Sequence, residues 1–555
     1  MTDKSYDAIV VGSGAAGSIA AKELTECGMT VALLEAGPYL GQKDFPTPIS
    51  GSEKLKKIDA VERIRIAIEG QHIQARATFI SDQIKHLFVN DRLNPYTTPQ
   101  RQFYLWIRSR QLGGRLHTYG RVLLRMSDYD FKAGQRDGNG DDWPLAYADL
   151  APYYDKVEEF LGVFGTEEKI RNLPNGKYIR TPRLTKLEEG FKAHVESNWP
   201  ERKVISWRFA APNVKRIPLG VQAALDTGRL DLRTDAVVKQ ILIDPATGKA
   251  TGVSYIDRNT RREHQVLGNV VVLCASAIES VRLLLNSACS RHPGGVGNSS
   301  GLLGKYFMDQ TPSMVFGSVP GSGGWEYDDS VPQDPFSRPA GGIYIPRFAN
   351  LDRVTYPDIA RGFAYQGVIG RNFVPEGHPA LFGLMGFGEM LARRDNCITL
   401  DRRKRDHWGI PAARIQCTLG QNDARLLREQ LRCVKEMVTS CGFKIDFAGS
   451  ALGLDDPAAA MPESPLLERW LFRASFKKSM ALGAAIHESG GARMGDDPAT
   501  SVLNPYNQCW DAKNVFVTDA SSFVSIGTVG PALTIMALTA RTCDYIAREY
   551  SRGNL

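Results

Sequence analysis

A glycine-rich turn near the start of the chain has the residue types and spacing of a dinucleotide site. Residues 12–17 read Gly12-Ser13-Gly14-Ala15-Ala16-Gly17, which matches the pattern G-x-G-x-x-G. In this pattern the first glycine permits a tight turn and the second lets a pyrophosphate approach the backbone. The third glycine lets the following helix pack closely on the strand. The N-terminus of that helix would present free N–H groups to the phosphates.

An acidic residue follows where a nucleotide ribose would need it. Glu35 lies 18 residues after Gly17, at the expected end of a second strand, and Ala36 comes directly after it. A carboxylate at this place can accept hydrogen bonds from both ribose hydroxyls and would repel a 2′-phosphate. The turn and the carboxylate together predict a dinucleotide, but they do not separate FAD from NAD.

A second glycine-rich segment, near the C-terminus, carries a histidine. In residues 486–495, His487 comes shortly before Gly490 and Gly491. An imidazole with an ordinary pKa of about 6.5 can accept a hydroxyl proton at neutral pH. The other eight histidines are interpreted as ordinary hydrogen-bonded residues.

Hydrophobic periodicity predicts the elements that must position these residues. An apolar strand over residues 6–11, a helical pattern over 18–28 and a strand over 29–34 form a β-α-β unit around the turn. Residues 229–238 and 240–255 alternate like antiparallel strands. Further strands are predicted over 269–275, 342–348, 363–369, 381–391 and 514–518, and helices over 52–70, 141–162, 277–286, 425–441 and 532–550.

Composition excludes several classes of protein. With 555 residues, 43% apolar and 23% charged, the chain is long enough for two domains of an ordinary globular protein. The net charge of +7 is spread out, and its densest basic run, residues 401–407, is interpreted as a solvated hairpin loop without a nucleic-acid partner. Nine scattered cysteines without a Cys-x-x-Cys pair indicate reduced thiols, with neither a disulfide framework nor a metal site.

Targeting signals are also not expected. The first residues run directly into the first strand, which leaves no room for a cleavable signal. No segment approaches the ~18 apolar residues that are needed to span a bilayer. We therefore expect a cytoplasmic protein without a membrane span.

An ordered set of motifs resembles the glucose–methanol–choline (GMC) oxidoreductase family. The set includes the N-terminal turn with Glu35, Leu112-Gly113-Gly114, Cys274-Ala275-Ser276-Ala277, and residues 301–308, 486–495, 515–521 and 527–534. Because the motifs occur in order over essentially the full length, the resemblance implies that the dinucleotide is FAD.

The resemblance implies an α/β fold with two domains. A discontinuous Rossmann-like FAD-binding domain would comprise residues 1–50, 101–130, 215–310 and 485–555. A substrate-binding domain with a mostly antiparallel sheet and helices would comprise residues 131–214 and 311–484, and its sheet would cover the isoalloxazine ring. Residues 51–100 would form an insertion or lid over the site.

The resemblance also assigns roles to single residues. His487 would be the catalytic base beside the flavin. The last helix would begin near Pro531, and its positive end would stabilise the negative charge of reduced flavin. The residues expected to bind FAD are Gly12, Ser13, Gly14, Ala15, Ala16, Gly17, Glu35, Ala36, Gly113, Gly114, His117, Thr118, Val237, Ala275, Asp519, Ala520, Gly530, Pro531 and Thr534.

The position before the proline of the last helix departs from the family pattern. Family members usually carry His or Asn there, which shares the substrate oxygen with the first histidine, whereas this chain has Gly530. Losing one such contact would cost on the order of 10²-fold in rate. Three interpretations stay open: Thr528 or a substrate-domain residue substitutes, the substrate geometry is unusual, or redox activity is impaired.

The second departure concerns how FAD is attached. Some relatives bind FAD covalently through a histidine four residues after the second glycine, and that position is Thr118 here. His117 lies one residue early, and a one-residue shift in an extended segment turns the side chain away. We therefore expect non-covalent FAD, with His117 near the flavin edge.

Within the family the chain looks most similar to bacterial sugar and glycoside dehydrogenases and oxidases. The segments 345–348, 388–391 and 487–495 carry this likeness, and the glycine- and aromatic-rich segment 322–370 could stack a sugar ring. We expect oxidation of a secondary ring hydroxyl of a sugar or glycoside to the ketone, by hydride transfer to flavin N5. The alternatives are a lyase-like relative with structural FAD and a non-enzymatic flavoprotein.

The electron acceptor and partners are expected from the same relatives. Oxygen, a quinone or a cytochrome could take the electrons. Some similar bacterial dehydrogenases pair with a small subunit that carries an export signal. Periplasmic residence by co-export with such a subunit is therefore the alternative to a cytoplasmic location.

Overall fold

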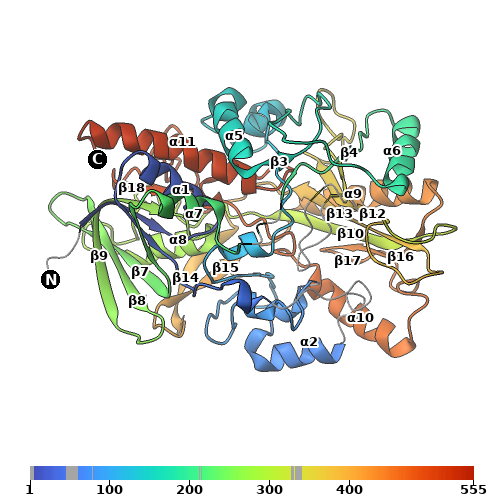
Figure 1. Ribbon diagram of the computed structural model, residues 1–555, viewed down its shortest axis with the longest axis horizontal. Helices are drawn as coiled ribbons and strands as arrows, with labels where there is room; N and C mark the ends of the chain where they lie inside the picture. The colour runs from blue at the N-terminus through green and yellow to red at the C-terminus, as the bar shows by residue number, and fades with distance from the viewer. Residues whose placement is uncertain are drawn as a thin grey trace.

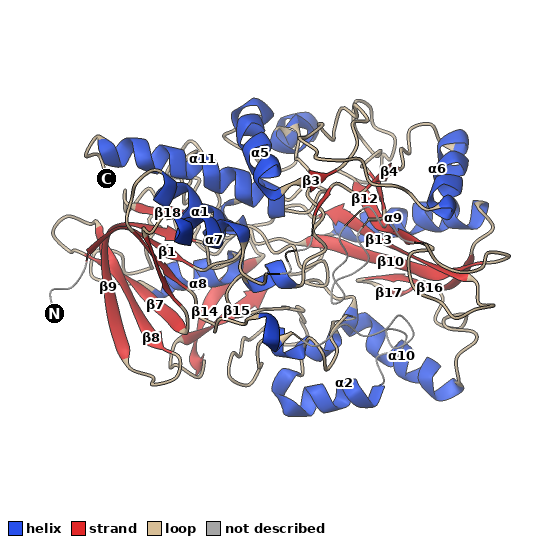
Figure 2. Ribbon diagram, in the orientation of Figure 1, coloured by secondary structure: helices blue, strands red, loops and turns tan. Residues whose placement is uncertain are grey.

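Most of the described strands belong to two large sheets at opposite ends of the molecule, as Figure 2 shows. Two strand pairs stand apart from them, β14 (Cys397–Arg405) with β15 (Pro411–Gln416) and β3 (Val163–Phe164) with β5 (Phe209–Ala210). The computed structural model describes residues 5–45, 60–77, 79–211, 213, 215–326, 331 and 341–555. Each sheet has seven strands, and helices cover both. This arrangement confirms the predicted α/β class with one partly parallel and one antiparallel sheet.

The first sheet is built around β1 (Ser5–Val11). It pairs in parallel with β2 (Val31–Leu34) on one side and with β9 (Glu263–Leu273) on the other. All four residues of β2 are buried, as expected for an inner strand whose two faces are both covered. The parallel pairing places the C-terminal ends of all three strands at one edge, where the glycine turn begins.

Two further parts complete this sheet. The first half of β9 pairs with β8 (Ala250–Asp257), and its last residues pair in parallel with β18 (Val515–Val517). β8 in turn pairs with β7 (Ala236–Ile243), and β6 (Leu230–Arg233) pairs with β2 at the opposite edge.

The prediction of one antiparallel strand over residues 229–238 was wrong. β6 pairs in parallel with β2, and the chain then turns before β7 starts the antiparallel hairpin with β8. The turn contains Asp235, whose φ of 56° lies in the left-handed region. Aspartate tolerates this conformation better than most residues. The alternation of apolar residues continues across the turn, so the pattern does not show that one strand ends and another begins.

Helices pack on both faces of the first sheet (Figure 1). α1 (Ala15–Glu26) contacts α7 (Leu219–Asp226) and α11 (Ala532–Ser551), and α11 also contacts α5 (Tyr147–Leu161). α8 (Ala277–Asn286) contacts β7 and the hairpin of β14 (Cys397–Arg405) and β15 (Pro411–Gln416). The basic run at 401–407 lies at the end of β14 and in the turn after it, and the four side chains from Arg402 to Arg405 are exposed.

The second sheet is antiparallel, in the order β17-β16-β10-β13-β12-β11-β4. Its central strands are β10 (Gln310–Val319), β13 (Ala380–Glu389) and β12 (Phe363–Ile369). α9 (Gln421–Ser440) covers one face, and glycines of β13 allow its close approach. A Cβ on Gly388 would lie only 2.2 Å from Leu426 Cδ2 of α9. The side chains of Met385 and Phe387 therefore stand on the other face.

The remaining elements are shorter or peripheral. They are β3 (Val163–Phe164), β4 (Ile205–Ser206), β5 (Phe209–Ala210), β11 (Ile343–Ile345), β16 (Lys444–Ser450), β17 (Gly453–Leu454), α2 (Ala60–Ile66), α3 (Asp128–Phe131), α4 (Ala133–Asp137), α6 (Lys186–Asn198) and α10 (Leu466–Ser479). Of the helix predicted over 52–70, residues 52–59 lie outside the described residues. The described part is α2 with a π-turn over Ala67–Gln71. The predicted domain boundaries stay a prediction.

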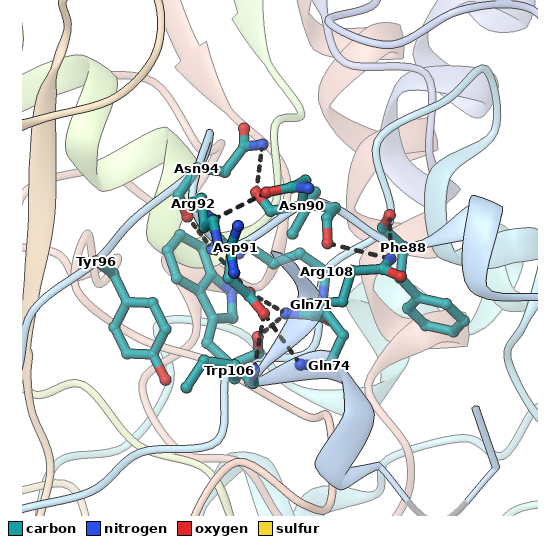
Figure 3. Close-up of polar contacts among 12 residues, drawn as sticks. Gln71, Gln74, Phe88, Asn90, Asp91, Arg92, Asn94, Tyr96, Trp106 and Arg108 are labelled. Carbon is teal, nitrogen blue, oxygen red and sulfur yellow. Dashed lines mark hydrogen bonds and ion pairs between the residues drawn. The ribbon is translucent and has the colours of Figure 1, made fainter. Parts of the chain in front are cut away.

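A buried polar network holds the segment after α2 against residues 104–108 (Figure 3). Asp91 accepts hydrogen bonds from the backbone N–H of Ile73 at 2.7 Å and from Gln74 Nε2 at 2.9 Å. Gln74 also bonds the backbone of Trp106 and Arg108, at 3.0 Å each. The Arg108 guanidinium lies 3.9 Å from the centre of the Trp106 ring. Burial lowers the pKa of Arg108 to about 10. This network positions one wall of the cavity described next.

Candidate active site

A cavity of about 370 Å³ is lined by residues of both sheets. Its lining includes Glu35 and Val237 of the first sheet and Met385 and Phe387 of the second. Small-molecule and cofactor sites typically have volumes of ~300–1,000 Å³. The cavity also lies where the parallel strands of the first sheet end, which is the usual place for a ligand in an α/β sheet.

The glycine turn borders this cavity, and its three glycines differ in what surrounds them. A Cβ on Gly17 would lie 1.7 Å from Gly12 O, and one on Gly12, with φ of 95°, would lie 2.5 Å from Cys274 O. A Cβ on Gly14 would meet no atom within 4 Å. Gly12 and Gly17 are therefore required by packing of the chain itself, whereas Gly14 keeps a surface of the cavity open.

Glu35 is fixed at the end of β2 by short hydrogen bonds. Its carboxylate accepts hydrogen bonds from Ser13 Oγ at 2.5 Å, Ser13 N at 3.2 Å and Gly37 N at 2.9 Å. Ser13 Oγ in turn accepts a hydrogen bond from Gly113 N at 2.9 Å. Burial raises the pKa of Glu35, and these hydrogen bonds act in the opposite direction. Ser13 thus ties three separate segments together at the cavity.

The side chain of Gln310, the first residue of β10, fixes the protonation of His487. Gln310 Nε2 donates to the carbonyl oxygens of Gly527 and Val529, at 3.0 Å each. Its Oε1 must therefore face His487, whose Nδ1 lies 2.6 Å away. Because an amide oxygen only accepts, Nδ1 carries the proton and Nε2 keeps a free electron pair.

The surroundings of His487 keep its imidazole neutral. Burial, and to a smaller extent the charge of the Arg115 guanidinium, lower the pKa of His487 to about 3. The ring packs on Phe387 with 5.3 Å between ring centres. A Cβ on Gly530 would lie 3.6 Å from His487 Nε2. The unprotonated nitrogen therefore faces an open part of the cavity beside Gly530.

A buried acidic cluster holds the backbone of this segment. Asp309 accepts hydrogen bonds from Gln310 N at 2.7 Å, from His487 N at 3.2 Å and from Tyr104 Oη at 3.1 Å. Burial and then the charge of Glu488 raise the pKa of Asp309 to about 7. Glu488 forms an ion pair with Arg115 at 2.6 Å. Both sides of His487 along the chain are thus anchored.

The cavity brings together most of the residues that the sequence nominated. Those on its lining are Gly12, Ser13, Gly14, Ala15, Ala16, Glu35, Ala36, Gly114, Thr118, Val237, Ala275, His487, Asp519, Ala520, Gly530 and Pro531. The nominated residues that do not line it are Gly17, Gly113, His117 and Thr534. Gly17 and Gly113 pack behind the lining, and Thr534 Oγ1 lies 2.8 Å from Tyr154 Oη.

The segment that carries His117 is not extended, contrary to the expectation. Residues Gly114–His117 form a 3-10 helix, η6, which begins after Gly113 in the left-handed conformation. His117 Nε2 lies 2.7 Å from Leu112 O, and its ring packs near Phe45 with 5.6 Å between centres. Thr118, and not His117, therefore borders the cavity.

Sequence motifs missed several residues of the site. Gln310 follows the motif at 301–308 by two positions, and only that proximity could have suggested it. Arg115, Gln366 and Phe387 carried no signal, because their importance depends on which face of a helix or sheet they occupy. Among the described residues, there is no cluster of His, Cys, Asp and Glu that could hold a metal ion.

Two further sequence expectations concern the chain as a whole. All nine cysteines are free thiols, as expected. No helix within the described ranges has the length and apolar character to cross a bilayer.

Comparisons with known proteins match the chain over most of its length. Two models described as GMC oxidoreductase match residues 6–310 and 392–539. The chain is 28% identical to a 2-methyl-1,2-propanediol dehydrogenase from Mycolicibacterium austroafricanum, over 98% of this chain and 96% of that protein. It is 24% identical to a fructose dehydrogenase large subunit from Gluconobacter japonicus, over 99% of each. A formate oxidase variant from Aspergillus oryzae has the same fold, with a TM-score of 0.64 over 100% of both chains at 15% identity.

The glycine turn predicts different effects for two similar substitutions. Gly17→Ala should prevent folding, because the new Cβ would overlap Gly12 O. Gly14→Ala should give a folded protein that has lost FAD, because the new methyl group would stand only on the cavity side. Circular dichroism and the flavin absorbance of the purified variants measure the two properties. A Gly14→Ala protein that retains full FAD would contradict this assignment.

The contact between Gln310 and His487 predicts a shift in pH dependence. His487 is neutral above its lowered pKa, so protonation of the base should slow flavin reduction only in strongly acidic solution. In Gln310→Glu, a carboxylate beside Nδ1 would favour the imidazolium and raise the pKa of His487, typically by ~1–3 units. The acidic limb of the rate of anaerobic flavin reduction should therefore move to higher pH.

A matched control exists on the opposite face of the same sheet. Gln430 is also fully buried, and within the described residues its amide nitrogen donates to Ser313 Oγ at 2.8 Å and to Thr311 O at 3.3 Å, and not to His487. Gln430→Glu should cost stability without moving the acidic limb. Equal profiles for Gln310→Glu and the wild type would show that Gln310 does not control the base.

Proposed function

Because the chain belongs to the GMC oxidoreductase family, whose members are FAD-dependent and act on CH–OH groups, we propose that it oxidises a secondary hydroxyl of a sugar or glycoside to the ketone, with His487 as the base. One observation carries the assignment of the base. His487 Nε2 is held unprotonated by Gln310 and faces the open part of the cavity beside Gly530. At Nε2, an imidazole in this state can accept a proton and has none to donate.

The cavity residues fit FAD. Glu35 would bind the adenosine ribose, and the turn at Gly14 with the N-terminus of α1 would hold the pyrophosphate. Asp519 and Ala520 would lie near the ribityl chain, and the N-terminal end of α11 near the flavin ring. Thr118 offers no nitrogen for a covalent bond, which supports non-covalent FAD. When bound, FAD supplies the hydride acceptor.

The chain's own residues would prepare the alcohol for loss of hydride. His487 Nε2 would accept the hydroxyl proton while the carbon-bound hydrogen leaves with its electron pair, so that the alcohol becomes a ketone. Gln310 would stabilise the resulting imidazolium, because its Oε1 accepts from Nδ1–H at 2.6 Å. Asp309 holds the backbone of His487, and Phe387 packs against its ring. The ring therefore does not need to reorient during proton transfer.

Gly530 supports a secondary hydroxyl as the group that is oxidised. A side chain at this position would begin 3.6 Å from His487 Nε2. Without that side chain, the space beside the base can accept the second carbon substituent of a secondary alcohol. This departure from the family pattern thus agrees with a substrate whose carbinol carbon carries two carbon substituents.

The names of two relatives support a small substrate rich in hydroxyl groups. One relative is a dehydrogenase of a 1,2-diol, and another is the large subunit of a fructose dehydrogenase. The second name also supports a small partner subunit for this chain, through which it would be co-exported to the periplasm and pass electrons to a cytochrome. Without that subunit we infer a cytoplasmic enzyme with oxygen or a quinone as acceptor.

Replacement of His487 tests the base. In His487→Asn, anaerobic flavin reduction by a panel of glycosides should slow by ~10²–10⁴-fold, because no group is left to accept the hydroxyl proton. The protein should retain FAD, and the exposed control His264→Asn should behave as the wild type. Unchanged reduction in His487→Asn would exclude it as the base. Wild-type turnover with no change in flavin absorbance would instead favour the lyase-like alternative.

Filling the space at Gly530 tests the substrate geometry. Gly530→Ala should fold, since its Cβ would lie at an ordinary contact distance of 3.6 Å. The methyl group should lower kcat/KM for secondary alcohols by roughly tenfold or more and should affect primary alcohols less. Gly190→Ala is the control, because a Cβ there meets no atom within 4 Å. An equal loss for both classes of alcohol would contradict the proposed geometry.

A further inference from the structure

One polar side chain of the cavity has no role in the reaction described so far. Gln366 lies on β12 and lines the cavity. Across the described part of the chain, no hydrogen bond or ion pair of its side chain is found. Its amide is close to the opposite wall, because a Cβ on Gly120 would lie 3.7 Å from Gln366 Nε2.

The two buried glutamines of this sheet and its covering helix behave differently. Gln310 uses its amide on His487, Gly527 and Val529, and Gln430 bonds Ser313 and the backbone of Thr311. Polar groups in protein interiors are normally bonded in this way. An amide that points into a cavity without a protein partner is therefore available to a ligand.

The register of the sheet places Gln366 close to the base. Gln366 pairs with Met385, and Ala364 pairs with Phe387, the residue that packs against His487. Gln366 therefore lies on the same face as Phe387. Along β12 it is two residues, or about 7 Å, from Ala364, the residue that pairs with Phe387. Its same-face neighbours on β13, Met385 and Phe387, offer no polar group.

The chemistry of an amide restricts what Gln366 can bind. It donates through Nε2 and accepts through Oε1, and a hydroxyl group can satisfy both. A carboxylate ligand could use only the donor, and an ammonium ligand only the acceptor. No formal charge stands on this side chain, so a neutral hydroxyl is the best match.

We propose that Gln366 binds the hydroxyl group adjacent to the one that is oxidised, so that the enzyme selects 1,2-diols and polyols over simple alcohols. This proposal rests on the proposed function, because it places the reacting hydroxyl at His487 Nε2. Gln366 determines specificity and does not take part in proton transfer. It also supplies, from the substrate-side sheet, a polar contact to the substrate that Gly530 does not provide.

Two alcohols that differ only in the adjacent hydroxyl test the proposal. 2,3-Butanediol and 2-butanol have only secondary hydroxyl groups, and the holoenzyme is mixed with each under anaerobic conditions. The wild type should prefer the diol by on the order of 10²-fold in the second-order rate constant of flavin reduction. In Gln366→Leu this preference should fall below about tenfold, because the rate constant for the diol should fall more than that for 2-butanol.

A binding measurement separates this proposal from the redox reaction. Pinacol and tert-butanol have no hydrogen on their carbinol carbons and cannot be oxidised, but only pinacol has two adjacent hydroxyls. Calorimetric titration should show tighter binding of pinacol to the wild type, and Gln366→Leu should lose this difference. Met385→Leu is the control, since it changes the apolar wall opposite Gln366 but removes no hydrogen-bonding group.

The outcomes distinguish the two proposals. If neither alcohol nor any glycoside reduces the flavin, the proposed function fails, and the pinacol titration still decides the role of Gln366. If Gln366→Leu retains both the kinetic preference and the binding difference, Gln366 does not recognise the adjacent hydroxyl. If Met385→Leu loses them to the same extent as Gln366→Leu, the shape of the wall and not the amide is responsible, which also overturns the proposal.

Discussion

The hydrogen bond between Gln310 and His487 is the contact on which the candidate site depends. Gln310 begins β10 of the antiparallel sheet, and its amide also bonds the loop of Gly527 and Val529 that leads into α11. One buried side chain thus connects the substrate-side sheet, the segment of the base and the last helix. Because the amide has no spare donor direction, it decides which imidazole nitrogen is left to accept a proton.

Around this contact, buried charges are used to position backbone and cavity walls. Buried Glu488 forms an ion pair with the partly exposed Arg115 beside the base, and Asp309 holds the N–H of His487. At another wall, Asp91 accepts hydrogen bonds from the backbone of the segment after α2. This network holds Arg108 in place on the cavity lining. Removing one partner of such a pair leaves an uncompensated buried charge, so these networks constrain geometry strongly.

Hydrophobic periodicity predicted a helix or strand correctly where the pattern ran without interruption through one segment. The strand and helix around the glycine turn, the helix over 277–286 and the last helix were all confirmed. Prediction failed where a short break interrupted a regular pattern, as at Asp235, and where a 3-10 helix replaced an expected extended segment at His117. Both depend on backbone conformations that hydrophobic alternation does not encode.

The sequence by itself indicated the family through an ordered set of motifs, and it nominated the glycine turn and His487, because each motif is a continuous run of residues. Only the tertiary structure decided the protonation of that histidine and placed the Gln366 amide, which has no partner among the described residues, on the lining of the same cavity. Gln310 and Gln366 lie 177 and 121 residues from His487 in the chain. Their roles follow from sheet register and from which face each side chain occupies, and those are decided by long-range packing.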